Sequence, residues 1–282
     1  GYTMVYGILR LINFAHGDVF MVAGLLGIYI SAVMPIYAAI PVVIILTVAL
    51  GFFIERAAYK PLRNAPRMSV MISAIGVSYL LQNTATYVTG GQPMTYPTIG
   101  ILNKTVDIVG TSTKLVVIIT PVLVLVLIVL LTQLINHTKI GMAMRAVSKD
   151  FETARLMGIK INNVISMTFV IGSALAVVGS ILYFTTYPAI TPTAGAMPGL
   201  KAFVAAVFGG IGSIPGAVVG AFIIGICENL IKGLDVILIK SGVTKQMLGL
   251  TTFSDAFTFA LLIIILIVKP TGLFGEKTTD KV

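Results

Sequence analysis

Residues 115–136 read LVVIITPVLVLVLIVLLTQLIN, twenty-two residues without one charged side chain. At the helical rise of 1.5 Å per residue, this stretch extends about 33 Å, which is enough to cross the hydrocarbon core of a bilayer. Backbone groups find no water inside lipid, so a crossing segment forms its hydrogen bonds internally as a helix. The stretch therefore predicts a transmembrane helix.

Apolar stretches of similar length lie on both sides of it. The whole chain is 57% hydrophobic and only 10% charged, against roughly 25% charged residues in an ordinary soluble domain. The predicted fold class is all-α, a polytopic transmembrane helix bundle that forms a single domain over residues 1–282. The residues 1–9 are expected to be the end of an incomplete first helix. The other expected spans are 13–34, 36–55, 68–89, 115–136, 163–187 and 253–268.

The basic residues predict how the bundle is oriented. The net charge is +9, but the charges lie in a few short loops, which favours membrane orientation over nucleic-acid binding. Of the 19 Lys and Arg residues, 13 fall on one side of the expected spans and 6 on the other. We therefore place the richer side, with the C-terminus, in the cytoplasm. Its members are Arg10, Arg56, Lys60, Arg63, Arg67, Lys139, Arg145, Lys149, Arg155, Lys160, Lys269, Lys277 and Lys281.

A run of glycines interrupts the apolar stretch 201–231 near its middle. The glycines are Gly209, Gly210, Gly212 and Gly216. The expected span before this stretch ends outside at residue 187, and the next expected span starts outside at residue 253. The stretch 201–231 must therefore enter the membrane and return. It is either a re-entrant hairpin or two short spans. A broken element at membrane depth is tolerated where protein or a water-filled cavity covers it, so it marks either a transport path or a site of close helix packing.

The loop 138–160 carries an apolar stripe on a helix or a pair of short helices. Its members recur at steps of four and three: Ile140, Met144, Val147, Phe151 and Ala154. Charged residues lie off the stripe, and Gly158 can end the helix in a left-handed conformation. Such a helix either docks on a partner protein or lies at the membrane surface against anionic lipid. The stripe and the charges together favour docking.

Several polar residues lie inside or beside the expected spans. In Asn13-Phe-Ala-His-Gly-Asp18, the side chains of His16 and Asp18 are expected in the cytoplasmic third of the membrane, where ionisable groups usually face the bundle interior or water. The alternative is that Asn13 caps the helix and Asp18 complements its positive end. Three other polar residues either line a path or bond to a neighbouring helix; they are Gln82, Asn83 and Glu228. Glu228 could equally lie among the outer headgroups.

Catalytic and metal-binding patterns are missing from the sequence. No His or Cys cluster has metal-ligand spacing, and no hydrolase elbow or zinc-protease motif occurs. Gly272-Leu-Phe-Gly-Glu-Lys-Thr278 superficially looks like a phosphate loop, but its glycine spacing is wrong. We expect a subunit that is not an enzyme and that binds no metal, cofactor or ATP itself.

Four motifs resemble one known family in the right order. They are Gly1-Tyr-Thr-Met-Val-Tyr-Gly7 with Asn13-Phe-Ala-His-Gly-Asp18, then Arg145–Ile159, Phe208–Ala217 and Lys269–Gly275. The chain resembles the branched-chain amino-acid permeases of ATP-binding-cassette (ABC) importers, and the likeness covers nearly its whole length. Relatives in the same superfamily import urea, short amides or other amino acids.

The resemblance implies a transport complex in the bacterial inner membrane. A sister permease, two cytoplasmic ATPase subunits that bind ATP and Mg²⁺, and a periplasmic substrate-binding protein would complete it. The family's cytoplasmic coupling helix carries Glu-Ala-Ala-x-x-x-Gly, and Glu152–Gly158 keeps this spacing with Thr153 in second place. Transport would proceed by alternating access. The coupling residues implied are Arg145, Lys149, Asp150, Glu152, Ala154, Arg155 and Gly158. A self-sufficient secondary carrier, or an intramembrane enzyme or scaffold, remains the alternative.

Overall fold

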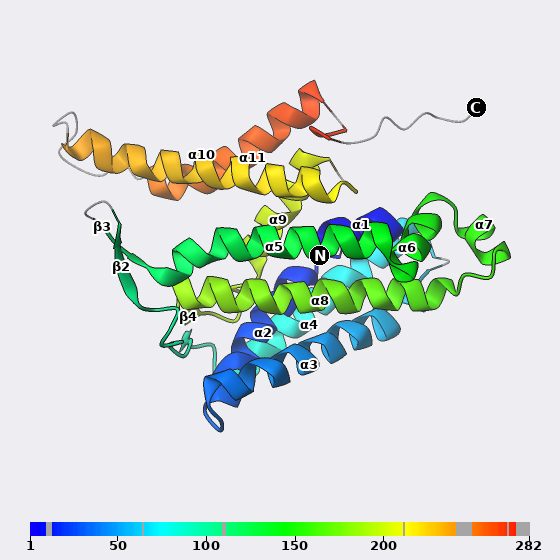
Figure 1. Cartoon of the computed structure of the whole chain (residues 1–282), viewed down its shortest axis with the longest axis horizontal. Coiled ribbons are helices and arrows are strands. Elements are labelled where there is room, and N and C mark those ends of the chain that lie inside the picture. Colours follow the sequence, from blue (N-terminus) through cyan, green and yellow to red (C-terminus); the bar gives the residue numbers. More distant parts are fainter. Residues whose placement is uncertain are drawn as a thin grey trace. The chain divides into compact units, whose positions relative to one another are not determined.

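The computed structural model describes residues 1–9, 13–63, 65–108, 111–210, 212–240, 250–269 and 271–274. Contacts divide the chain into two compact units, Gly1–Gly199 and Leu200–Val282. Each unit is a bundle of helices (Figure 1). Compactness alone does not make either unit an independent domain, so the single transport domain expected over the whole chain stays a prediction. Arg10, Lys245, Lys277 and Lys281 lie outside the described residues.

Four helices among the described residues are long and apolar enough to cross a membrane. Apolar runs of this length form helices because lipid leaves backbone groups no other partner. They are α3 (Ile36–Ile54), which a π-helix η1 (Glu55–Tyr59) continues, α5 (Leu115–His137), α8 (Ile161–Thr186) and α10 (Ile214–Lys240). The all-α polytopic fold class is therefore confirmed.

The remaining helices are shorter or less apolar. α4 (Arg67–Thr89) has spanning length but carries more polar side chains than α5, which exposes mainly Val, Leu and Ile. α1 (Tyr2–Leu9) is a short apolar helix at the start of the chain. Three further apolar helices are shorter than a full span. They are α2 (His16–Ser31), α9 (Ala196–Gly209) and the part Phe253–Val268 of α11 (Leu250–Val268).

Helix α2 packs against α3, α4 and α8 within the first unit. Small residues allow this close packing. A Cβ at Gly24 would lie 2.6 Å from the ring of Phe184, and a Cβ at Gly27 would lie 2.9 Å from that of Tyr96. Met21, Leu25 and Ile190 complete the buried cluster around them.

Two short strand pairs lie in the first unit. β1 (Met94–Thr95) pairs antiparallel with β4 (Ala189–Ile190), and β2 (Thr105–Ile108) pairs antiparallel with β3 (Thr111–Lys114). The hairpin β2–β3 lies at one end of α5, and the short helices α6 (Lys139–Lys149) and α7 (Phe151–Leu156) lie beyond the other (Figure 1).

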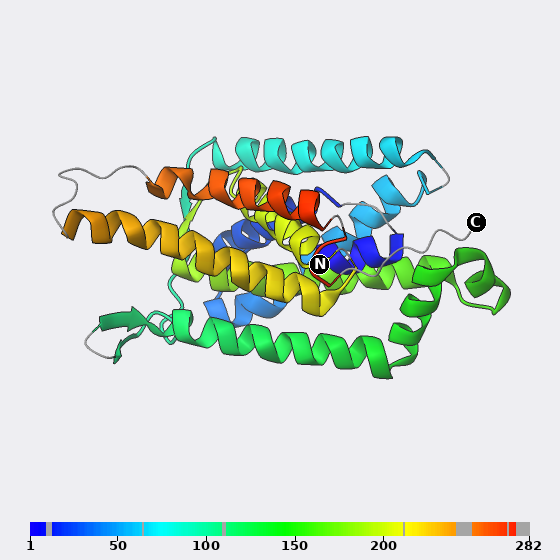
Figure 2. The same ribbon diagram turned by 90° about the horizontal axis from the view of Figure 1, so that it is seen from above.

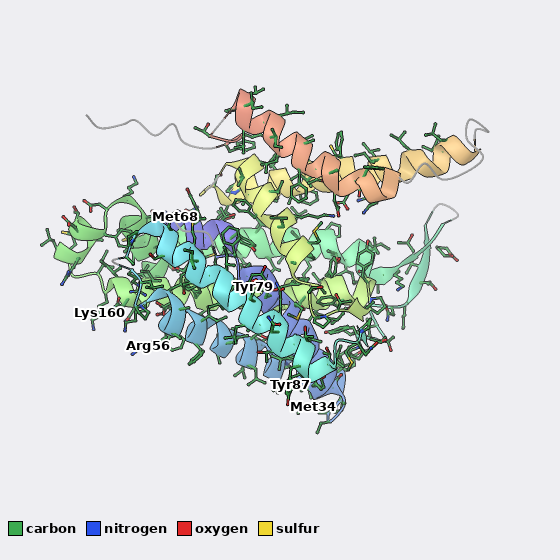
Figure 3. The ribbon with its side chains drawn as sticks, turned by 180° about the vertical axis from the view of Figure 1, so that it is seen from behind. Met34, Arg56, Met68, Tyr79, Tyr87 and Lys160 are labelled. Carbon is green, nitrogen blue, oxygen red and sulfur yellow. The ribbon has the colours of Figure 1, made fainter. Side chains whose placement is uncertain are left out.

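The two ends of the first unit differ in charge. Arg56 and Lys160 lie at one end, and Met34 and Tyr87 lie at the other (Figure 3). The basic residues of η1, α6 and α7 thus gather at the same end, which we call the α6–α7 end.

The segment after α8 corrects the bounds expected for the broken element. From β4 the chain runs antiparallel to α2, since Ile190 lies against Gly24 and Gly195 lies against Gly17. Helix α9 begins at that level and has 14 residues, about 21 Å, which is less than the hydrocarbon thickness. The first leg of the element is therefore 188–209, part extended and part helical, and not a helix starting at residue 201. The return leg, α10, has 27 residues and is long and apolar enough to cross a membrane alone.

Candidate functional site

A buried polar cluster joins the first turn of α2 to α4. The Asp18 side chain is almost fully buried, with 2% of the residue exposed. The Ser78 hydroxyl donates to Oδ2 of Asp18, and the Gln82 side-chain amide donates to Oδ1 at 3.0 Å. Gln82 also donates to the Ser78 hydroxyl oxygen at 3.2 Å. Two residues singled out from the sequence, Asp18 and Gln82, thus meet in one cluster.

This cluster lies near the middle of α4. Ser78 and Gln82 are 11 and 15 residues beyond the start of α4 at Arg67, or about 17 and 22 Å along its axis. Helix α2 starts at His16 rather than at residue 13, so Asp18 lies in its first turn. The place expected for His16 and Asp18, in the cytoplasmic third of the membrane, stays a prediction.

Asn13 does not cap α2. The residue preceding the helix is Ala15, and no side chain caps it. Instead, the buried Asn13 Oδ1 accepts a hydrogen bond of 2.7 Å from the Tyr59 hydroxyl on η1. His16 is half-buried, and its ring meets that of Tyr2 edge to face at 5.0 Å between centroids. Asn13 thus ties α2 to η1 rather than starting a helix.

A second buried carboxylate, that of Glu55, was missed in the sequence. Glu55 is completely buried at the start of η1, forms an ion pair with Arg63 and accepts a 2.7 Å hydrogen bond from Ser166 on α8. Arg63 also donates to Asn162 on α8. The sequence signal is an acidic residue that directly follows 19 apolar helical residues. It was overlooked because Arg63 was counted only as a loop charge.

The loop 138–160 forms two short helices, α6 and α7, that break at Asp150. Thr138 Oγ1 accepts from the Gly141 N–H at 3.0 Å and caps α6. Asp150 Oδ1 accepts from the N–H groups of Glu152 and Thr153 at 2.9 and 3.3 Å and caps α7. Such caps satisfy backbone donors that a helix start leaves unpaired. The role of Asp150 in the fold is thus to start α7.

The apolar stripe of this loop packs mainly on the chain itself. Met144, Val147 and Ala154 are buried, and α6 contacts α1, α5 and α8, whereas Ile140 and Phe151 are exposed. The stripe that was expected to meet a partner is therefore largely used within the first unit.

A different apolar pair is left uncovered at the tip of the loop. Leu156 is 87% exposed and Met157 is 78% exposed. Gly158 follows them in a left-handed conformation with φ 81°, as expected for the residue after a helix. The charged residues around the tip are exposed as well, and α6 and α7 project from the end of α8 (Figure 2). They are Arg145, Lys149, Glu152 and Arg155.

The expected glycine break lies between α9 and α10, within the second unit. A Cβ at Gly209 would lie 2.6 Å from the Ala217 nitrogen, and one at Gly220 would lie 3.0 Å from the Gly209 nitrogen. Gly210 and Gly212 have φ angles of 105° and 97°, which L side chains rarely adopt. Gly216 is likewise packed against Gly209. Close packing and a forced turn both require these glycines.

The last described segment of the chain completes the end of α9. The N–H groups of Leu273 and Phe274 donate to the carbonyls of Phe208 and Gly209 at 2.9 and 3.0 Å. A Cβ at Gly272 would lie 2.6 Å from the Cα of Gly210. Helix ends leave carbonyls unpaired, and here a segment that follows α11 supplies the donors. The contact joins two of the family motifs, Phe208–Ala217 and Lys269–Gly275, and the sequence did not predict it.

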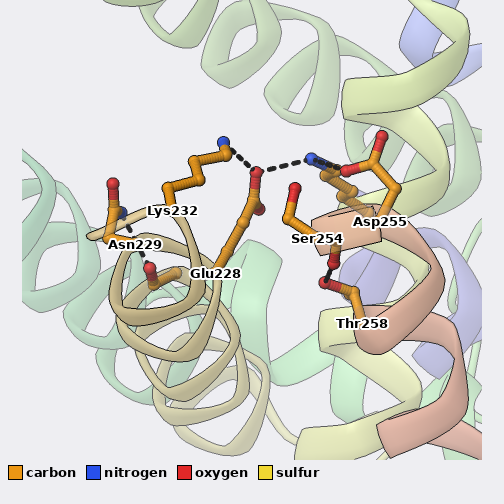
Figure 4. Close-up of polar contacts among 8 residues, drawn as sticks. Glu228, Asn229, Lys232, Ser254, Asp255 and Thr258 are labelled. Carbon is orange, nitrogen blue, oxygen red and sulfur yellow. Dashed lines mark hydrogen bonds and ion pairs between the residues drawn. The ribbon is translucent and has the colours of Figure 1, made fainter. Parts of the chain in front are cut away.

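The two remaining polar candidates differ. The Asn83 side chain is exposed and donates to the Tyr79 carbonyl of its own helix at 2.8 Å. Glu228 on α10 instead accepts from Lys201 on α9 at 2.9 Å and from Lys232 on α10, and Lys201 also pairs with Asp255 on α11 at 2.6 Å (Figure 4). Among the described residues, no group of three or more His, Cys, Asp or Glu could hold a metal ion.

These features define the class of protein as a multi-pass membrane protein with buried polar side chains between its helices and a glycine break between α9 and α10. The family profile described as branched-chain amino acid transport system / permease component matches residues 1–266. The chain belongs to this family.

Curated relatives match over the full chain. It is 39% identical to the high-affinity branched-chain amino acid transport system permease protein LivH of Salmonella typhimurium, over all of this chain and 91% of that protein. It is also 39% identical to the permease protein BraD of Pseudomonas aeruginosa, over all of this chain and 92% of that protein. A probable LivH of Methanocaldococcus jannaschii is 26% identical over 98% of this chain and 86% of that protein. No solved structure matches the chain.

Proposed function

We propose that this chain is the membrane-spanning permease subunit of an ATP-binding-cassette importer that translocates branched-chain amino acids by alternating access. Membership of a permease family whose curated members transport branched-chain amino acids supports the substrate class. A permease component works within a transport system, so partner subunits are expected. The partners we propose are a sister permease, two ATPase subunits that carry ATP and Mg²⁺, and a periplasmic binding protein.

The α6–α7 pair is the proposed docking element for the ATPase subunits, and one observation carries this proposal. Leu156 and Met157 are large, apolar and exposed at the tip, and the charged Glu152 and Arg155 stand beside them. An exposed apolar centre with charged neighbours is the usual composition of a protein interface. A helix held at a lipid surface would instead bury a continuous apolar face in lipid, and here that face is packed inside the first unit.

The orientation follows from this docking role. The α6–α7 end faces the cytoplasm of a bacterial cell and the β2–β3 hairpin faces the periplasm. The basic residues of η1, α6 and α7 at that end agree with the tendency of cytoplasmic loops to carry Lys and Arg. The membrane is the inner one, because only there do ATPase subunits reach the chain.

The transport movement would use the packed elements described above. Closure of the ATPase subunits presses on α7, and α6 transmits the movement to α1, α5 and α8, with which it is in contact. To shift a two-state equilibrium from 1:99 to 99:1 requires about 5.5 kcal/mol of differential interaction, which docking of ATP-bound subunits supplies. The buried cluster of Asp18, Ser78 and Gln82 and the break between α9 and α10 are the proposed path elements.

The deciding experiment is purification followed by reconstitution. An affinity-tagged chain in mild detergent should bring ATPase subunits with it. Vesicles that contain this complex and a periplasmic binding protein should take up leucine, isoleucine or valine only when ATP is inside the compartment with the ATPases. Uptake by this chain alone without nucleotide would instead establish a self-sufficient carrier.

A further inference from the structure

Four charged side chains on three helices of the second unit form a continuous chain of alternating sign. In order they are Lys232, Glu228, Lys201 and Asp255. Glu228 Oε1 accepts from both lysines, and Lys201 Nζ bonds to both carboxylates (Figure 4). The middle pair is the more buried, with side-chain exposures of 13% for Glu228 and 26% for Lys201, against 38% and 40% for Asp255 and Lys232.

Two members of this network, Glu228 and Lys232, fall within the candidate membrane span Ile214–Leu234. Glu228 is 14 residues beyond the start of α10 at Ile214, about 21 Å along the helix. Lys201 is eight residues before the end of α9 at Gly209, about 12 Å from the level of the glycine break. Charged residues inside transmembrane segments are expensive, pair with one another and typically mark substrate or ion pathways.

On each of the three helices, an apolar residue lies one helical turn from a charged residue of the network. Val204 and Ala205 follow Lys201 on α9, Ile224 precedes Glu228 on α10, and Phe259 follows Asp255 on α11. All four belong to a single hydrophobic cluster. The network therefore forms the charged edge of an apolar core that three helices share.

We propose that this network binds the charged end of an amino acid during its passage, with the ammonium group against Glu228 and Asp255 and the carboxylate against Lys201 and Lys232. The branched side chain packs beside Phe259, a partly buried residue at the edge of the apolar cluster. This inference rests on the proposed function and assigns a substrate site within it. The ligand is a zwitterion with an aliphatic side chain.

Charge balance favours this ligand over a simple ion. Two lysines and two carboxylates make the network neutral. A zwitterion that enters between Lys201 and Glu228 replaces one ion pair by two, and no buried charge is left alone. A single anion or cation would instead give the neutral network a net charge, which is costly beside the largely buried side chain of Glu228.

The test uses the complete complex in lipid nanodiscs, without the periplasmic binding protein, and measures binding of radiolabelled leucine. Two competitors each lack one charge of leucine, 4-methylpentanoate and 3-methylbutylamine. Unlabelled leucine should displace the label at concentrations at least about tenfold lower than either competitor, because each loses a charge-assisted interaction. Equal competition by one of them would overturn the proposal.

Two variants and one control separate binding from stability. Glu228→Gln and Lys201→Met should raise the Kd for leucine at least about tenfold. Asn229→Ala is the matched control, since this neighbour of Glu228 is exposed and bonds to the Gly225 carbonyl in its own helix; its Kd should stay the same. A lower melting temperature with an unchanged Kd in both charge variants would show a structural ion-pair network and overturn the site.

Uptake measurements distinguish a failure of the proposed transport function from a failure of the proposed binding site. If wild-type vesicles show no ATP-dependent uptake of any branched-chain amino acid, the proposed function fails. If wild-type uptake is intact and Glu228→Gln transports leucine with an unchanged concentration dependence, only the site fails.

Discussion

The side-chain amide of Gln82 on α4 donates to Oδ1 of Asp18 on α2 across 3.0 Å, although the two residues are 64 positions apart in the chain. Ser78 donates to the other oxygen of the same carboxylate. A carboxyl group level with the middle of α4 therefore has its hydrogen bonds supplied by neutral side chains of that helix.

We predict that Asp18→Asn lowers uptake while the protein stays folded. The substituted amide would keep an oxygen for Gln82 and place an NH2 donor opposite Ser78, whose hydroxyl can turn to accept it, so the melting temperature in detergent should change little. Uptake of leucine by vesicles should fall at least about tenfold, because an ionisable group at this depth acts on the transported substrate or on its path.

Asp18→Ala provides the comparison. It leaves Ser78 and Gln82 without their common acceptor and should destabilise the fold by about 1–3 kcal/mol. Asn83→Ala, on the same helix as Gln82 but exposed and bonded within that helix, should change neither uptake nor melting temperature. Wild-type uptake in Asp18→Asn would exclude a role of the charge in transport.

The double variant Glu152→Ala/Arg155→Ala should uncouple transport from ATP hydrolysis. Both side chains are exposed beside the apolar tip of α7, so their loss weakens the interface without disturbing the buried face. Co-purification of ATPase subunits or leucine-dependent ATP hydrolysis should fall several-fold, while the amount of chain in the membrane stays constant.

Asp107→Ala is the control for this variant. Asp107 pairs with Ser112 in the β2–β3 hairpin, at the opposite end of α5, and its loss should leave hydrolysis coupled. Full uptake and a stable complex in the double variant would contradict the docking role of α7.

Gly212→Val should block uptake without preventing assembly. A side chain at Gly212 would meet no atom within 4 Å, but its φ of 97° costs a branched residue about 1–3 kcal/mol. The strain acts on the turn between α9 and α10, so the change should be seen in uptake by assembled complexes. Gly225→Val, on α10 with equally open surroundings, is the helical control, and equal uptake in the two variants would remove the break from the path.

Glu55→Leu should be among the most destabilising single substitutions in the first unit. It leaves the guanidinium of Arg63, itself largely buried, without its carboxylate, and breaking a buried ion pair in this way costs about 3–5 kcal/mol. The double variant Glu55→Leu/Arg63→Met removes both charges and should recover much of the loss in melting temperature. A single variant as stable as the wild type would show that the pair contributes little.

Apolar length was sufficient to predict most of the helices. The stretch 115–136 predicted α5 and 163–187 predicted α8 within two residues, because no other structure satisfies the backbone in lipid. The break at Gly209–Gly216 was also predictable, since adjacent glycines and Pro215 do not favour a continuous helix.

Contacts between distant residues could not be predicted in the same way. The sequence offers no signal that Asn13 pairs with Tyr59 or that Lys201 reaches Asp255, because helix faces are matched only when the bundle packs. Glu55 and the extended leg before α9 were missed for a related reason. Apolar periodicity locates helices, but it does not show which polar residue a neighbouring helix covers.

The N–H groups of Leu273 and Phe274 donate to the carbonyls of Phe208 and Gly209. The end of α9 can therefore complete its hydrogen bonds only after residues 273 and 274 have been synthesised. A ribosome releases residue 209 into the membrane before it has made the segment that pairs with that helix end. Until α11 has been inserted, α9 is left with exposed carbonyls, and its final position waits for the closing residues of the chain. A nascent protein arrested after α10 would therefore hold α9 without these two hydrogen bonds until synthesis resumes.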